Sequence, residues 1–246
     1  MPNQLLKSSF LRLPMVDALR GIALVAMIIF HGSWNLDVFG FAQLGVMSSP
    51  GWIWFARIIA GSFILLAGLS LLLAENAGHG ASSKVKRIAK ISIAAIAVSI
   101  ATYFVFPESF VYFGILHHIA LASLLAWPLL RMNSVVLATI AIAVVAANQS
   151  FAFEFANTHW LAWIGISQEI PATNDYVPLV PWFSVFLVGM ILGKEIVSQD
   201  GVSRILKQIP AWTTPLIWMG RRSLPIYLLH QPILFGMAYG VFMLSR

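Results

Sequence analysis

The sequence places three ionisable side chains in a stretch that is otherwise apolar. Residues 17–31, DALRGIALVAMIIFH, begin with Asp17, continue through Arg20 and end with His31. Arg20 and His31 are eleven positions apart, close to three turns of an α-helix, and Asp17 stands about one turn before Arg20. One helix face would therefore carry an Asp–Arg pair and, about 16 Å further along, an imidazole. Because an imidazole exchanges protons near neutral pH, this face predicts proton-transfer chemistry.

Two more histidines are neighbours in FGILHHIALA (113–122). The side chains of His117 and His118 would point about 100° apart on a helix, so only one of them can face a given site. We expect one of the two to lie at the depth of His31, together with Arg57. A structural role is the alternative for each histidine, as a hydrogen-bonded core residue, and for Asp17 and Arg20, as an interfacial salt bridge.

The segment GRRSLPIYLLHQP (220–232) combines polar groups with two prolines. Prolines break helices, and broken helices are tolerated at membrane depth where they line a cavity. Tyr227 and His230 share a helix face, and Gln231 adds an amide, so we expect a substrate site here. We place His230 nearer the cytoplasmic side than His31. Trp182, which follows two prolines in DYVPLVPWF (175–183), is a further candidate, or else a residue of the interfacial aromatic belt.

The chain that must position these groups is very apolar. Of its 246 residues 59% are hydrophobic and only 10% are charged, and the mean hydropathy is +0.85. Soluble domains carry about 25% charged residues, so we predict an all-α, polytopic integral membrane bundle that forms a single domain over residues 1–246. The absence of cysteine excludes disulfides and thiol catalysis. The expected spans are 13–34, 52–74, 91–106, 111–130, 133–149, 177–193 and 223–243, of which the third and fifth are short.

Lys and Arg residues concentrate in alternate connections between these seven segments, and acidic residues lie in the others. The positive-inside rule then places the N-terminus in the cytoplasm and the C-terminus outside. The first segment is expected to be retained and not cleaved as a signal peptide. Residues 210–220, PAWTTPLIWMG, would lie in the inner interface or enter the membrane and return. The net charge of +6 is thereby explained by topology, and no nucleic acid partner is expected.

Basic side chains at the cytoplasmic face suit an anionic ligand. Such side chains bind phosphorylated molecules, but they serve anionic lipid headgroups equally well. The candidates for phosphate binding are Arg221, Arg222, Lys84, Lys86 and Arg87.

Four stretches, taken in order, resemble one known family. MVDALRGIALVAMIIFH (15–31) resembles the first helix of the heparan-α-glucosaminide N-acetyltransferase catalytic-domain family, including its small bacterial members. Residues 112–126, 175–193 and 220–232 match further stretches of that family. The resemblance implies an integral-membrane enzyme that uses cytoplasmic acyl-CoA and passes the acyl group to a sugar amine or hydroxyl on the other side. His31 matches a histidine of the bacterial members.

We therefore expect a transmembrane acyltransferase, with acetyl as the transferred group by resemblance. His31 is the first candidate for the general base and His118 the second, while Asp17 and Arg20 would hold the donor in register. The partners would be the lipid bilayer, acyl-CoA and a glycan or other small acceptor, in a bacterial inner membrane, and a homo-oligomer is compatible with the sequence.

Two other functions use the same residues. A proton-coupled transporter or flippase also needs broken helices and intramembrane histidines, although the chain shows no internal repeat. A haem or metal protein would use His31, His118 and His230. We expect no metal or haem, because these three histidines are placed at different depths and no histidine pair has the spacing of metal ligands.

Overall fold

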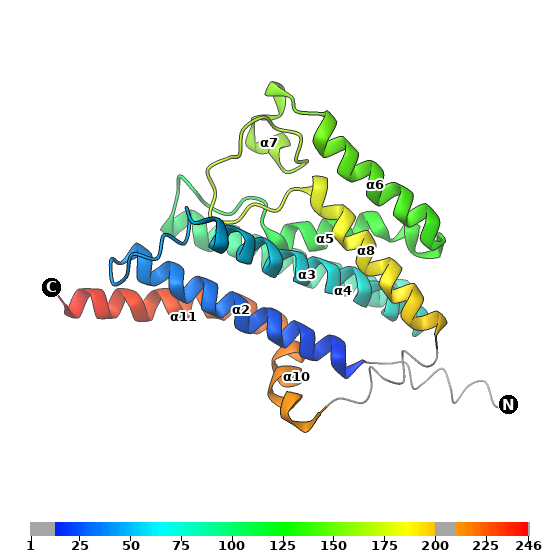
Figure 1. Cartoon of the computed structure of the whole chain (residues 1–246), viewed down its shortest axis with the longest axis horizontal. Coiled ribbons are helices and arrows are strands. Elements are labelled where there is room, and N and C mark those ends of the chain that lie inside the picture. The colour runs from blue at the N-terminus through cyan, green and yellow to red at the C-terminus, as the bar shows by residue number, and fades with distance from the viewer. Residues whose placement is uncertain (1–12, 200–209, 246) are drawn as a thin grey trace. The chain divides into compact units, whose positions relative to one another are not determined.

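The structure, a computed structural model, describes residues 13–199 and 210–245. Over this part of the chain the secondary structure is helical, as the sequence predicts, apart from two isolated β-bridges. The helices are α2 (Pro14–Val38), α3 (Pro50–Asn76), α4 (Ala81–Val105), α5 (Ile115–Ala126), α6 (Ser134–Ser150), α7 (His159–Ala162), α8 (Leu179–Ser198), α10 (Thr214–Arg221) and α11 (Ser223–Leu244), with short 3₁₀ turns at Pro128–Arg131, Glu154–Ala156 and Ala211–Thr213 (Figure 1).

The chain divides into two compact units. The terminal unit consists of the described residues 13–63 and 210–245, and it contains α2, the first half of α3, α10 and α11. The central unit consists of residues 64–199 and contains the second half of α3 and α4 to α8. Each unit is described by itself.

In the terminal unit, α10 packs against the first turns of α2 through two glycines. A Cβ atom at Gly21 would overlap the backbone carbonyl of Leu216, and a Cβ atom at Gly220 would overlap the carbonyl of Asp17. Small residues of this kind let two helix backbones approach closely in a membrane. The close approach fixes α10 beside the part of α2 that carries Asp17 and Arg20.

Helix α11 begins two residues after α10 ends and continues along α2 in the same direction. The ring of His31 lies 4.9 Å from that of His230, and further along both helices Phe39 lies 5.1 Å from Phe235. The sequence predicted a helix broken at two prolines, and this prediction is wrong. Helix α11 is continuous. Pro225 lies in its first turn, where a missing N–H costs no helical bond, and the helix continues through Pro232.

Apolar packing between α2, α3 and α11 forms the core of the terminal unit. Leu24 and Met27 of α2 and Ile59 of α3 are buried. Aromatic side chains surround them, and two of these, Phe63 and Tyr227, meet edge to face at 6.3 Å. The face of α2 opposite this core is exposed and apolar, as expected for a helix in contact with lipid.

In the central unit, α8 packs against α6, α5 and the second half of α3. Glycines again allow the closest contact. A Cβ atom at Gly68 would overlap the carbonyl of Phe186, and one at Gly189 would overlap the carbonyl of Leu65. Helix α5 also packs against α4, and its residues point mostly into the unit.

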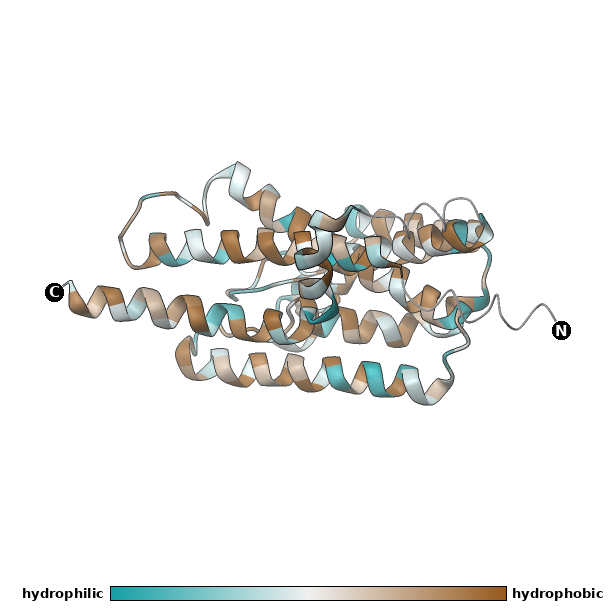
Figure 2. Ribbon diagram, turned by 90° about the horizontal axis from the view of Figure 1, so that it is seen from below, coloured by the Kyte–Doolittle hydropathy of each residue, from teal (hydrophilic) through white to brown (hydrophobic). Residues whose placement is uncertain are grey.

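Five of the described helices, α2, α3, α4, α8 and α11, are long and apolar enough to cross a membrane. Helices α5 and α6, with 12 and 17 residues, are shorter. The sequence predicted a short third segment, and this is wrong: α4 has 25 residues because the basic stretch before it is already helical from Ala81 onwards. The fourth segment is the shorter one, since α5 begins only at Ile115 and Pro128 starts a 3₁₀ turn. Figure 2 shows apolar residues along much of the helices.

Replacement of Gly21 by alanine should destabilise the protein, whereas the same change at Gly32 of the same helix should not. Both changes raise helix propensity by about 1 kcal/mol. Only the new methyl group at position 21 meets a backbone carbonyl, since nothing lies within 4 Å of a Cβ at Gly32. Thermal unfolding in detergent, followed by tryptophan fluorescence, should show a lower Tm for Gly21→Ala and an equal or higher Tm for Gly32→Ala. Equal Tm values for the two variants would contradict the close crossing of α2 and α10.

Candidate active site

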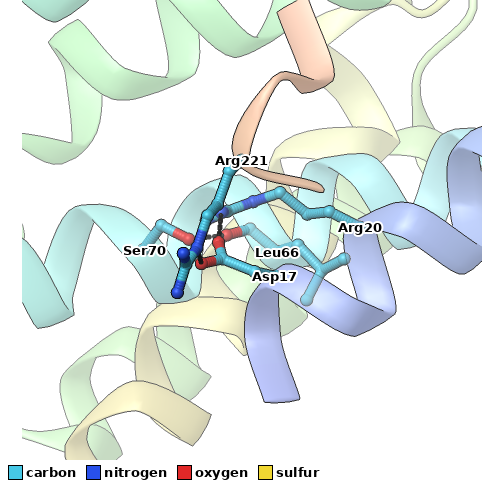
Figure 3. Close-up of polar contacts among 5 residues, drawn as sticks. All are labelled: Asp17, Arg20, Leu66, Ser70 and Arg221. Carbon is cyan, nitrogen blue, oxygen red and sulfur yellow. Dashed lines mark hydrogen bonds and ion pairs between the residues drawn. The ribbon is translucent and has the colours of Figure 1, made fainter. Parts of the chain in front are cut away.

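Asp17 is the centre of a cluster of charges in the terminal unit. Its side chain is buried, and one carboxylate oxygen lies 2.7 Å from Nη1 of Arg20, one turn along α2. The other oxygen lies 3.5 Å from Nε of Arg221, the last residue of α10 (Figure 3). A carboxylate in apolar surroundings needs such partners, because a lone buried charge is very costly. We call these three residues the Asp17 cluster.

The two neighbouring arginines of the predicted phosphate site have different partners. Arg221 contacts Asp17 through Nε, so the remaining donors of its half-exposed guanidinium can bind another group. Arg222 is exposed, and its guanidinium lies over the ring of Trp218 at 4.7 Å. A cation held on an indole face keeps its in-plane N–H groups for a ligand. Both arginines therefore remain candidates for phosphate binding.

Two imidazoles meet further along the same pair of helices. The ring centroids of His31 and His230 are 4.9 Å apart. His230 is buried, its Nδ1 lies 2.6 Å from the backbone oxygen of Tyr227, and its ring lies 5.7 Å from the Tyr227 ring. The shared face of Tyr227 and His230, predicted from their spacing, is confirmed. We call His31, His230 and Tyr227 the histidine cluster.

The depth that the sequence predicted for His230 is wrong. The sequence places His230 nearer the cytoplasm than His31, but the two rings lie 4.9 Å apart. Helix α10 occupies the place beside the beginning of α2, where Gly220 meets Asp17, and α11 begins only after it. Helix α11 therefore starts beyond the first turns of α2, and its His230 lies beside His31.

An amide pair adjoins the histidine cluster. The side chains of Asn35 and Gln231 exchange two hydrogen bonds, each of 3.5 Å. Gln231 was a predicted site residue, but Asn35, which is only 2% exposed, was missed. A signal for Asn35 was available, because it stands four residues after His31 and so lies on the same helix face. The pair offers both donors and acceptors to a polar ligand.

In the central unit the two adjacent histidines have different surroundings. His117 accepts a hydrogen bond from the Gly114 backbone N–H at Nδ1, 3.3 Å away, and its Nε2 lies 3.1 Å from the hydroxyl of Ser99. His118 is completely buried, and neither ring nitrogen makes a hydrogen bond with a described residue, although the backbone of Val177 and Pro178 lies beside it. His118 is therefore the more deeply buried member of the pair, and its part in the reaction stays a prediction.

The turn before α5 is held by an acid that the sequence analysis did not assign to a site. Asp175 accepts a hydrogen bond of 2.9 Å from the N–H of Ile115 at the start of α5. Burial raises the pKa of the Asp175 carboxyl, and the hydrogen bond from Ile115 opposes this shift. The parallel bridge between Phe113 and Tyr176 lies next to it. These contacts hold the N-terminal end of α5, which carries His118, against the segment before α8.

The basic residues at the start of α4 are largely engaged within the central unit. Lys84 is buried, forms an ion pair with Glu75 and lies 5.4 Å from the ring centre of Trp127. Arg87 donates to the carbonyl of Ala67 at 3.2 Å. Lys86 is exposed. Of these three predicted phosphate-binding residues, Lys86 has the side chain most accessible to a ligand.

Two further predicted substrate-binding residues are Arg57 and Trp182. Arg57 of α3 is exposed and its guanidinium lies 5.2 Å from the ring centre of Trp54, one turn earlier on the same helix. Trp182 is partly exposed in the first turn of α8. Neither has a described hydrogen bond that ties it to the other candidates, so their roles stay predictions.

The terminal unit thus offers guanidinium groups at one level of α2 and two neighbouring imidazole rings at another. Guanidinium groups bind phosphates, and imidazoles transfer protons. Among residues 13–199 and 210–245, no group of three or more His, Asp or Glu side chains is arranged to hold a metal ion.

Comparison with known families gives one match. The family model for "Heparan-alpha-glucosaminide N-acetyltransferase, catalytic" matches residues 12–232, which include both clusters. No curated protein and no solved structure matches the chain significantly.

Replacement of Asp17 by alanine should destabilise the terminal unit, because two arginines lose a buried partner. Both arginines are partly exposed and regain some hydration, so we expect a loss of about 1–3 kcal/mol, or a Tm lower by roughly 5 °C. Glu108→Ala, at an exposed acidic residue, serves as the control and should leave the Tm unchanged. An Asp17→Ala variant as stable as this control would show that the cluster does not hold α10 on α2.

Proposed function

The chain belongs to the heparan-alpha-glucosaminide N-acetyltransferase catalytic family, a family of membrane acetyltransferases, and from this premise we propose its reaction. It transfers an acyl group, acetyl in the first instance, from cytoplasmic acyl-CoA to an amine or hydroxyl of a sugar-type acceptor at the outer side of a bacterial inner membrane. The observation that carries the proposal is the meeting of His31 and His230 at 4.9 Å within apolar helices. Titratable groups at such depth are usually functional.

In the proposed reaction His31 is the general base. It takes the proton from the acceptor's N–H or O–H, and the freed lone pair attacks the thioester carbonyl. A bond forms between the acceptor atom and the acyl carbon, the C–S bond breaks, and the proton ends on the sulfur of CoA. His118 is the second candidate for the base, since its ring nitrogens are buried and unpartnered among the described residues.

The donor's phosphates bind at the Asp17 cluster and the arginine beside it. Arg222 is exposed on Trp218, and Arg221 keeps donors beyond the one that contacts Asp17. Arg20 lies in the same cluster, and Asp17 holds both cluster arginines in place. Acyl-CoA is anionic, and charge-assisted hydrogen bonds from guanidinium groups are the strong ones for phosphate. Lys86 is the remaining accessible candidate, on α4.

Uncharged polar side chains beside the histidine cluster support the proposed binding of a sugar-type acceptor. The amides of Asn35 and Gln231 offer donors and acceptors that suit hydroxyl groups, and Tyr227 presents a ring beside His230. A sugar with hydroxyl and amine groups fits this chemistry.

His31→Ala should abolish acyl transfer while the protein still binds acetyl-CoA. Loss of a general base lowers the rate by about 10² to 10⁴-fold. The measurement is release of CoA from acetyl-CoA with glucosamine as acceptor, detected with a thiol-specific dye. The chain has no cysteine, so the dye reports CoA alone. Full activity of the variant would refute the role of His31. Absence of CoA release by wild-type protein, with acetyl-CoA and with longer acyl-CoAs, would refute the acyltransferase and leave proton-coupled transport as the working hypothesis.

Arg222→Ala should weaken acetyl-CoA binding about tenfold or more, because one charge-assisted hydrogen bond to phosphate is lost. Isothermal calorimetry of the purified protein in detergent measures the Kd. Arg222 is chosen because it makes no ion pair with Asp17, and Arg131→Ala, at another exposed cytoplasmic arginine, is the matched control. An unchanged Kd for Arg222→Ala would remove the phosphate site from this end of α10.

A further inference from the structure

The protonation of the His230 ring follows from a single contact. Its Nδ1 lies 2.6 Å from the backbone oxygen of Tyr227. A carbonyl oxygen can only accept a hydrogen bond, so Nδ1 must carry the hydrogen. In the neutral ring Nε2 then holds the lone pair. This nitrogen is buried and has no hydrogen-bond partner among the described residues.

The imidazole of His31, on α2, lies beside the ring of His230. Its centroid lies 4.9 Å from that of His230, with the two ring planes inclined by 57°. Rings at this separation can bring a nitrogen of each within hydrogen-bond distance when their edges turn towards each other. His31 makes no hydrogen bond of its own with a described residue, so a rotation of its ring breaks none. The Phe30 ring lies 5.3 Å from the His31 ring, and the Tyr227 ring lies 5.7 Å from the His230 ring, measured between centroids.

We propose that His230 is a positioning residue for His31 in the acyl transfer proposed above, on which this inference rests. The Tyr227 carbonyl fixes the proton of His230 on Nδ1, and the Nε2 lone pair accepts a hydrogen bond from one N–H of His31. The second nitrogen of His31 is then unprotonated and faces the acceptor. A backbone carbonyl and a second imidazole together fill the orienting role that a carboxylate fills in a Ser-His-Asp triad.

The proton has a complete route in this arrangement. The acceptor's N–H or O–H gives its proton to the free nitrogen of His31 as its lone pair attacks the thioester. His31, now cationic, is stabilised by its hydrogen bond to Nε2 of His230. As the C–S bond breaks, the same proton passes from His31 to the thiolate of CoA, and both rings return to their neutral forms.

The hydrogen bonds decide which ring is the base and which positions it. Nδ1 of His230 is committed to the Tyr227 carbonyl and its Nε2 is inaccessible, whereas His31 makes no hydrogen bond with a described residue. The order along the proposed hydrogen bonds is therefore the Tyr227 carbonyl, His230, His31 and the acceptor. The only free nitrogen of His230 bonds to His31 in this arrangement, so His230 acts on the acceptor only through His31.

Two substitutions of His230 separate positioning from a merely structural role. His230→Phe keeps a ring of similar size but removes the lone pair, and we expect kcat to fall about 10²-fold with an unchanged KM for acetyl-CoA. His230→Gln restores an acceptor atom near the position of Nε2, and its kcat should be at least tenfold higher than that of His230→Phe. Leu229→Phe, at an exposed apolar residue of the same helix, is the control and should keep wild-type kcat.

A spectroscopic measurement tests the same point without turnover. In protein labelled with ¹⁵N-histidine, the ring nitrogens of His230 should show hydrogen on Nδ1, and the tautomer signal of His31 should change in His230→Phe but not in Leu229→Phe. Wild-type kcat in His230→Phe would overturn the proposal. So would a His230→Gln variant no better than His230→Phe with the His31 signal unchanged, because His230 would then act as the base itself. If wild-type protein releases no CoA, the acyl transfer fails, and the ¹⁵N signals alone decide whether His230 positions His31.

Discussion

The close approach of α10 to α2 is the contact on which the site depends. Gly21 and Gly220 let the backbones of the two helices touch, and no larger residue fits at either place. This contact puts Arg221 on Asp17, since Arg221 is the next residue along the chain. Helix α11 begins two residues after α10 ends, and its His230 meets His31. The contact through the two glycines thus places the Asp17 cluster and comes directly before the helix that carries His230.

The low dielectric of the membrane explains why polar groups of the terminal unit occur in pairs. Asp17 has two guanidinium partners, Asn35 has Gln231, and His230 has the Tyr227 carbonyl. Each pairing reduces the cost of removing a polar group from water. Nε2 of His230 has no such partner among the described residues, and in the central unit neither nitrogen of His118 has one. Unpaired lone pairs of this kind lower the stability of the fold. On an imidazole, such a lone pair is suited to proton transfer.

The sequence predicted the helices and the shared faces well, because both depend on local spacing. The face with Asp17, Arg20 and His31 lies on one continuous helix, and Tyr227 and His230 are in contact as expected. The depth of His230 was wrong because it depends on α10, whose eight residues are too few to identify by hydropathy. The length of α4 was misjudged because its basic first turns resemble a loop in composition. Partners such as Glu75 for Lys84 depend on contacts between helices, which single-sequence patterns do not contain.

The spacing of the two clusters along α2 constrains the donor in the proposed reaction. The eleven residues from Arg20 to His31 advance about 16 Å along the helix. A donor whose charged groups bind at the Asp17 cluster must therefore carry its reactive carbonyl on a long arm to reach the imidazoles. Acyl-CoA is built in this way, with its phosphates far from the thioester. A short donor would leave its acyl group among apolar side chains such as Leu24 and Met27, which lie between the two levels and offer no group for proton transfer. In the proposed reaction, the apolar stretch between the charges and the histidines would thus select for the length of the donor, and the charged cluster would select for its phosphates.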